Sequence, residues 1–172
     1  MDDRRRHFEE SFWPHLRGAY NLARWLVGNP HDAEDVVQES FTRAFERAGG
    51  FRGGDPRTWL LAIVRNTAIN FLQRKKPKAE VAWNERMAEP ADGAPDPEKA
   101  MLRDSQRARV RAAVQRLPGE FREALVLREL EGMAYKEIAA VLDVPLGTVM
   151  SRLSRARHLL MEELLPEKEG GL

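Results

Sequence analysis

The segment Val144–Leu160 (VPLGTVMSRLSRARHLL) contains three arginines and no acidic residue, although the whole chain has a net charge of only +1. At helical spacing, its apolar residues share one face and leave polar and basic side chains on the opposite face. The apolar set is Val149, Leu153, Ala156 and Leu160, and the opposite set is Thr148, Ser151, Arg152 and Arg155. Serine and arginine side chains can reach base edges and phosphates in a DNA major groove. This segment is therefore a candidate DNA-reading helix.

A basic amphipathic helix can also bind an acidic partner, lie on a membrane or remain a solvated surface. Membrane binding is disfavoured here, because the apolar stripe is needed for packing on the preceding segment EIAAVL and contains no Trp or Phe. We favour DNA reading over a solvated basic face. Arg157 and His158 lie nearer the C-terminal end of the segment, so we expect them to reach only phosphate.

Two helices joined by a short turn, the second of them basic, have the outline of a helix-turn-helix. The first would be AYKEIAAVL, whose Ile138 and Leu142 can meet Val149 and Leu153 in a small core. Asp143 stands where the chain must turn sharply, and Asp tolerates a positive φ better than most residues. The spacing therefore predicts a helix-turn-helix near the C-terminal end of this sequence.

The segment HDAEDVVQES gathers acids within a predicted helix: Asp32, Asp35 and Glu39 fall at i, i+3 and i+7, beside Gln38. Such a face could dock on a basic partner. The helix dipole alone explains Asp32 and Glu34, which lie near the helix N-terminus, but it explains the later residues less well. A metal site is disfavoured, because no second histidine lies at ligand spacing.

A third segment, FRGGDPRTWLLAIVRNTAINFLQRKK, combines aromatic, amide and basic side chains. Stacking surface beside positive charge suits single-stranded nucleic acid. The candidate residues are Phe51, Arg52, Arg57, Trp59, Arg65, Asn66, Asn70 and Arg74. The competing interpretation is a helix core, which we accept for Leu60 and Ile63 and favour for Trp59. Core packing does not explain Arg65, Asn66 and Asn70, which fall off the apolar stripe.

These segments require helices to position them, and apolar spacings of three and four predict an all-helical chain without strands. The first helix is expected over about Arg6–Val27, with a break at Pro14. The second starts near Asp32 as its cap and ends at Gly49-Gly50, and the third runs from Pro56 to the basic run QRKK. The expected inward residues are Phe8, Phe12, Leu16, Tyr20, Ala23 and Leu26; Val36, Val37, Phe41, Ala44 and Phe45; and Leu60, Ile63, Val64, Thr67 and Phe71.

The composition then shifts to Pro, Ala and acidic residues, which predicts a linker over 77–96. Asp96 would cap a further helix carrying Leu102, Val110, Ala113, Val114 and Leu117. After Pro118-Gly119 comes a helix carrying Phe121, Ala124, Leu125 and Leu130, which Gly132 ends, and the helix-turn-helix follows. The fold class is therefore all-α, with two small helical domains joined by a flexible linker.

Composition limits the function classes further. The chain has no cysteine, which excludes disulfides and thiolate metal sites and makes a reducing cytoplasm the expected location. No apolar region follows the basic N-terminal cluster, and the longest apolar run, TWLLAIV, is too short to span a bilayer. No nucleophile–base pair or glycine-rich phosphate loop indicates an enzyme, and no cofactor or metal is expected.

The run LPGEFREALVLRELEGMAYKEIAAVLDVPLGTVMSRLSRARHLL resembles the C-terminal domain of extracytoplasmic-function (ECF, group 4) sigma factors of the sigma-70 family. DAEDVVQESFTRAFE and WLLAIVRNTAINFLQRKK resemble the other domain of that family. The resemblance covers nearly the whole chain in family order. It implies a region 2-like domain over 1–76, a linker over 77–96 and a region 4-like domain over 97–172.

The resemblance implies a bacterial transcription initiation factor that binds core RNA polymerase, directs it to promoters and assists promoter melting. The basic helix would then read the minus-thirty-five element, and the loop Phe51–Arg57 with the helix after it would capture the opened strand of the minus-ten element. The acidic face, with Arg43 further along its helix, would dock on the clamp coiled coil of the polymerase β′ subunit, and region 4 would bind the β flap. An anti-sigma factor is a further expected partner, and the free chain is expected to be a monomer.

Three residues depart from the family pattern: Asn70 replaces the usual Asp, Met150 a frequent Lys and Asp143 a frequent Gly. The second departure removes one phosphate contact, and the third is stereochemically tolerable. The alternative function is a helix-turn-helix regulator that acts independently of core polymerase, with an N-terminal sensor or dimerisation domain. A regulator would bind duplex DNA alone as a dimer, whereas a sigma factor would bind promoters tightly only with polymerase. An enzyme is a more distant alternative.

Overall fold

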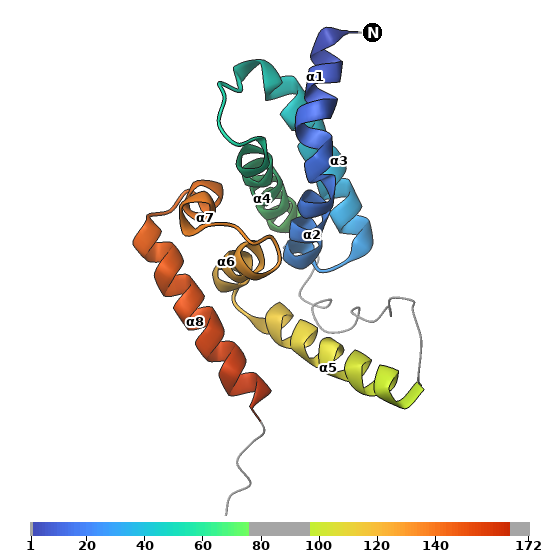
Figure 1. Cartoon of the computed structure of the whole chain (residues 1–172), viewed down its shortest axis with the longest axis vertical. Coiled ribbons are helices and arrows are strands. Elements are labelled where there is room, and N and C mark those ends of the chain that lie inside the picture. The colour runs from blue at the N-terminus through green and yellow to red at the C-terminus, as the bar shows by residue number, and fades with distance from the viewer. Residues whose placement is uncertain (1, 76–96, 166–172) are drawn as a thin grey trace, which may run out of the picture.

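The computed structural model describes residues 2–75 and 97–165, and every regular element in these two ranges is helical (Figure 1). The all-α prediction is therefore confirmed. The predicted linker over 77–96, including the expected cap Asp96, lies outside the described residues. Among the described helices, none combines the length and apolar character that crossing a bilayer would take.

The N-terminal half contains α1 (Asp3–Phe12), η1 (Trp13–His15), α2 (Leu16–Val27), α3 (Pro30–Arg47), η2 (Ala48–Gly50) and α4 (Pro56–Lys75). The expected break at Pro14 is present as the 3₁₀ turn η1. Proline favours such an interruption, because it has no N–H to donate within a helix. Gly28 ends α2 with φ 87°, a conformation that suits glycine.

Side chains cap the N-termini of both α3 and α4. The cap of α3 is not the residue that was expected. Asn29, not Asp32, is the N-cap of α3, and its Oδ1 accepts a 2.9 Å hydrogen bond from the Asp32 N–H. The helix begins at Pro30, two residues before the predicted start, because proline is well tolerated at the first helical position. At α4, Asp55 Oδ1 accepts from the Arg57 N–H at 3.1 Å and Oδ2 from the Thr58 hydroxyl at 2.8 Å.

The C-terminal half contains α5 (Pro97–Arg116), α6 (Gly119–Glu129), α7 (Tyr135–Leu142) and α8 (Leu146–Leu164). Gly132 turns the chain after α6 with φ 62°. The helices α6 and α7 pack against α2 and α4, so the two halves lie together (Figure 1). One buried apolar cluster runs through both halves: it includes Leu22, Leu60 and Val64 from the first, and Leu127, Ile138 and Leu153 from the second.

Four residues that were predicted to face the core are exposed instead: Leu16 (37% exposed), Leu102 (65%), Val110 (45%) and Leu130 (55%). Leu16 directly follows η1, and the tighter 3₁₀ turn breaks the helical period on which the prediction relied. The N-terminal half of α5 projects away from the other described helices in Figure 1, and Leu102, in that half, is not covered by them. Leu130 caps the C-terminus of α6 and is no longer on its buried face.

Candidate nucleic-acid interface

The predicted helix-turn-helix is confirmed as α7, a turn through Asp143, and α8. Asp143 adopts the left-handed conformation with φ 53° and ψ 51°, and the Val144 N–H donates to the Ala139 carbonyl at 3.2 Å. The expected small core is present, since Ile138, Leu142, Val149 and Leu153 are at most 2% exposed. The angle between the two helices is thus held by a buried apolar contact and a single strained turn.

The opposite face of α8 presents a row of polar and basic side chains. Ser151 and Arg155 are exposed and lie one turn apart, and Thr148 is partly buried at the N-terminal end of the row. The Ser151 hydroxyl donates to the Thr148 carbonyl at 3.0 Å, which fixes the orientation of that side chain. This face can approach a groove without rearrangement of the core beneath it.

Arg152 lies apart from that row and leans on α6. Its side chain is only 19% exposed, with Nη1 3.6 Å from Glu123 Oε1 and Nη2 3.8 Å from Glu120 Oε2. Near the other end of the row, Arg157 binds Glu129 at 2.9 Å, and this hydrogen bond is the main cause that raises the pKa of Arg157 above its ordinary value. His158 Nε2 lies 3.2 Å from Glu162 on the exposed side of α8.

The aromatic residues before and within α4 form part of the core edge. The rings of Phe51 and Trp59 lie 5.2 Å apart, and each contacts the buried ring of Phe12, at 5.7 and 5.2 Å. Arg52 is exposed, and the following Gly53 and Gly54 have φ values of 87° and 97°. A hollow of about 410 Å³ opens between this loop, the start of α4 and one side of α7.

The polar candidates on α4 separate into two groups. Asn66 and Asn70 are exposed, whereas Arg65 makes a two-pronged contact with Glu123 of α6, at 3.0 Å from Nε and 3.1 Å from Nη2. Arg57 contacts Glu131, which follows α6, at 3.1 Å. Arg74 extends the other way and binds Glu39 of α3 at 3.3 Å. The structure therefore brings the α4 candidates to one helix but does not gather them at one point.

Helix α3, which carries the acidic residues, lies on the side of α2 and α4 away from α6, α7 and α8 (Figure 1). Asp35 and Gln38 are exposed. Glu39 accepts from Arg43 at 2.5 Å and from Arg74 at 3.3 Å, and Asp32 binds Lys75 at 2.8 Å. The exposed side chains of Asp35 and Gln38 are thus available to a partner, whereas Asp32 and Glu39 are already in ion pairs. Within the described residues, no cluster of three or more His, Cys, Asp or Glu could hold a metal ion.

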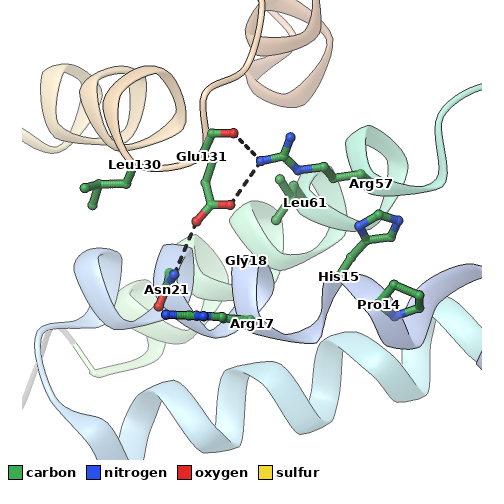
Figure 2. A pocket seen from close by; sticks show the side chains of 9 residues that line it. All are labelled: Pro14, His15, Arg17, Gly18, Asn21, Arg57, Leu61, Leu130 and Glu131. Atoms are coloured by element: carbon green, nitrogen blue, oxygen red, sulfur yellow. Dashed lines mark hydrogen bonds and ion pairs between the residues drawn. The ribbon is translucent and has the colours of Figure 1, made fainter.

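Sequence reasoning missed Glu123 and Glu131. Glu123 is only 4% exposed, and Glu131 sits over Gly18 of α2, between Asn21 and Arg57 (Figure 2). One signal was available: FREALVL places a charged residue directly before four apolar ones, at a position that the helix buries. A buried carboxylate needs a cationic partner, but the sequence does not say which one.

Comparisons with known proteins agree in both halves of the chain. Residues 13–77 match the family model for sigma-70 region 2, and residues 107–160 match the model for sigma-70 region 4. The RNA polymerase sigma-H factor of Pseudomonas aeruginosa is 41% identical over 149 residues, which cover 82% of this chain and 77% of that protein. The ECF RNA polymerase sigma factor SigE of Mycolicibacterium smegmatis is 37% identical over 158 residues, covering 91% and 61%.

Among solved structures, the sigma factor RpoE from Bartonella quintana, in complex with the anti-sigma factor NepR, superposes with a TM-score of 0.73 and 26% identity. That match covers 92% of this chain and 96% of RpoE. The helix-turn-helix, the second helical domain and the relatives in sequence and structure lead to one conclusion. The chain belongs to the extracytoplasmic-function sigma factors of the sigma-70 family, and it acts in transcription initiation with core RNA polymerase and promoter DNA.

Proposed function

We propose that α8 reads the minus-thirty-five element of the promoter with Ser151, Arg152 and Arg155, that Thr148 supports this row, and that Arg157 and His158 contact phosphate. The observation that carries the proposal is the exposed row of Ser151 and Arg155, backed by a buried face of Val149, Leu153 and Ala156. A helix so anchored can enter a major groove while its core stays intact. Arg152 must leave its contacts with α6 before it can reach a base.

The loop before α4 and the exposed side of that helix then capture the opened strand of the minus-ten element. The support for this role is the exposure of Arg52, Asn66 and Asn70. A hollow lined in part by the rings of Phe51 and Trp59 gives further support. A base that leaves its stack needs a pocket with an aromatic wall, and the backbone that carries it needs cations. Arg57, Arg65 and Arg74 are the cations of this helix.

On the other side of the N-terminal domain, the α3 face docks on the clamp coiled coil of the polymerase β′ subunit. Its docking residues are Asp32, Asp35, Gln38, Glu39 and Arg43. The exposure of Asp35 and Gln38 supports this role, since capping does not account for polar groups so far along the helix. Region 4 binds the β flap. The domain boundaries in this proposal are 1–76 and 97–172, with a linker over 77–96.

Further partners follow from the family. RpoE of Bartonella quintana was solved with an anti-sigma factor, and an anti-sigma factor is the regulator that we propose for this chain. The chain itself acts by binding rather than by catalysis. It acts in the cytoplasm, because core polymerase meets promoter DNA there. The free chain is a monomer.

The proposal is tested with purified chain and bacterial core polymerase. We expect the chain to co-elute with core polymerase and to direct run-off transcription from promoters selected from a random library. In the absence of polymerase it should elute as a monomer and bind the selected duplexes weakly. A dimer that binds those duplexes tightly by itself, and that leaves core polymerase unbound, would instead identify an independent regulator.

A further inference from the structure

A polar hollow of about 380 Å³ lies between the two halves of the chain (Figure 2). Its walls come from η1 and the first turns of α2, from the first turns of α4, and from the segment that follows α6. Most of the side chains that line it are polar or charged. Sites for small molecules usually measure about 300–1,000 Å³, so this hollow has room for a small ligand.

The hollow already holds one anionic group, the carboxylate of Glu131 (Figure 2). Its Oε2 accepts from Arg57 Nη2 at 3.1 Å, and its Oε1 accepts from Asn21 Nδ2 at 3.4 Å. A Cβ at Gly18 would lie 2.8 Å from Oε2, so the glycine leaves room for the carboxylate where it lies. The donors and the shape of this site therefore suit oxygen atoms that carry negative charge.

The cations around the hollow are not all occupied by Glu131. In the part of the chain that the structure describes, the Arg17 side chain makes no hydrogen bond or ion pair, and Arg57 donates only from Nη2. The His15 imidazole supplies a further N–H donor. Asp55, the acid on which His15 acts electrostatically, is engaged as the cap of α4. Two arginines and a histidine thus share the hollow with one carboxylate.

We propose that this hollow binds the phosphate group, free or esterified, of a small molecule without a nucleobase. Guanidinium groups bind phosphate oxygens through charge-assisted hydrogen bonds, and Arg17 and Arg57 have such donors left. A phosphate ester carries about −1.5 to −2 charges at pH 7, which matches the surplus of cations better than a second carboxylate does.

The rest of the lining limits what can carry the phosphate. No Phe, Tyr or Trp is among the residues that line the hollow, so a nucleobase has no such ring to stack on. The apolar side chains of Leu61 and Leu130 suit the carbon skeleton of a sugar or a short aliphatic chain. The ligand class is therefore inorganic phosphate or a small sugar or aliphatic phosphate.

This inference goes beyond the proposed promoter contacts, with which the hollow shares Arg57 alone. Its test uses neither polymerase nor DNA, so it can fail while the proposed function stands. Arg17 carries no role in that function, and Arg17→Gln removes its charge while keeping an amide. Arg6→Gln, at an exposed position of α1, makes the same change away from the hollow.

Isothermal titration calorimetry of the full chain, at constant ionic strength, measures binding of inorganic phosphate, glucose 6-phosphate and glucose. We expect one saturable site for at least one of the two phosphates and none for glucose. The tighter of the two phosphates shows whether the ligand is free phosphate or an ester. Arg17→Gln should weaken binding on the order of tenfold, as for the loss of one charge-assisted hydrogen bond, and Arg6→Gln should not. Absence of a saturable site, or equal weakening in both variants, overturns the proposal.

Glu131→Gln gives a test of the opposite sign. It removes the carboxylate that repels the ligand and competes for Arg57, and glutamine keeps an oxygen that can accept from Arg57. Binding of the phosphate should tighten on the order of fivefold, the effect of removing one nearby like charge in water. Glu10→Gln, an exposed change on α1, should leave the affinity as it is. Unchanged or weaker binding in Glu131→Gln contradicts the proposal.

Amide chemical shifts locate the bound phosphate, which matters because the basic face of α8 also attracts anions. In ¹H–¹⁵N spectra of the full chain, the amides of Gly18 and Asn21 are expected to shift as the tighter phosphate is added. The amide of Gly147, at the start of α8, is expected to stay in place. Shifts at Gly147 with none at Gly18 would place the phosphate on α8 and overturn the proposal.

Discussion

The arginines of α8 differ in what surrounds them, and this difference predicts different losses. Arg155 is exposed beside Ser151, whereas Arg157 is bound to Glu129 at 2.9 Å near the end of the row. A base-reading arginine contributes about 1–3 kcal/mol of discrimination, and a phosphate contact contributes a salt-dependent affinity that is the same for all sequences. We therefore expect Arg155→Ala to flatten the base preference at particular positions of the minus-thirty-five element. Arg157→Ala should keep that preference and reduce the salt slope by about 0.9.

These two variants are compared as holoenzymes on promoters that carry every single substitution in the upstream element. Lys136→Ala, an exposed basic residue of α7, controls for the general loss of one charge. A uniform loss of affinity in Arg155→Ala, with the base profile unchanged, would reassign Arg155 to phosphate binding.

Asp55 makes stability depend on pH in the acid range. Burial acts to raise the pKa of its carboxyl group, but hydrogen bonds from the Thr58 hydroxyl and from the N–H groups of Arg57 and Thr58 outweigh burial and lower it below the ordinary value. A lowered folded pKa gives stability that is full above the unfolded pKa of about 3.9 and is lost as the pH falls through the folded pKa. Asp55→Ala should therefore cost about 1 kcal/mol at pH 7 and progressively less below pH about 4.

Urea unfolding of parent and Asp55→Ala between neutral and acid pH measures this difference. Asp55→Ser keeps a capping oxygen without an ionisable group, and it should recover most of the loss at pH 7. A difference between parent and Asp55→Ala that stayed constant down to about pH 2 would show that the charge of Asp55 plays no part.

At the scale of elements, α3 separates capping from docking along one helix. Asn29 caps it, Glu34 lies in the N-terminal part where the helix dipole favours acids, and Asp35 and Gln38 are exposed side chains that neither effect explains. The double variant Asp35→Ala, Gln38→Ala should keep its helicity, because alanine is a good helix former. It should lose about tenfold or more in core polymerase affinity, as expected for the centre of an interface.

Glu34→Ala is the matched control, since it removes an exposed acid from the same helix. Circular dichroism checks the helix, and fluorescence titration against core polymerase measures the affinity. If the double variant and Glu34→Ala bound core polymerase as tightly as the parent, α3 would not be the docking face.

The sequence predicts an element correctly where the residue itself determines the local backbone structure. The break at Pro14 and the positive φ at Asp143 depend on the residue itself, and both were predicted. The inward face of α8 was also predicted, because a regular helix repeats its apolar positions every three to four residues. The period misled at Leu16, after the 3₁₀ turn, and at Leu102, where α5 projects from the other helices.

At the scale of the whole molecule, the sequence did not predict the contacts between the two halves. Periodicity identifies which residues of a helix are buried, but it does not identify the helix that buries them. Arg65 and Glu123 are 58 positions apart, and their contact depends on α6 packing against α2 and α7 packing against α4. Arg65 was therefore interpreted as a free cation of the minus-ten face, and Glu123 was not interpreted at all.

The shared core also predicts coupled unfolding. Three of the four tryptophans, Trp13, Trp25 and Trp59, lie in the N-terminal half, and Trp83→Phe removes the fourth. Leu153 of α8 is 1% exposed and belongs to the cluster that runs through both halves. In the Trp83→Phe background, Leu153→Ala should cost about 2–5 kcal/mol. Because the halves are joined, we expect it to move the urea midpoint of the N-terminal tryptophan fluorescence together with that of the circular dichroism.

Met161→Ala, at a position 61% exposed on the same helix, should leave both midpoints in place. Coincident transitions are the sign of a single cooperative unit. If Leu153→Ala lowered the circular dichroism midpoint while the tryptophan transition stayed where it was, the two domains of the free chain would unfold independently. The apolar cluster that joins them would then contribute little to stability.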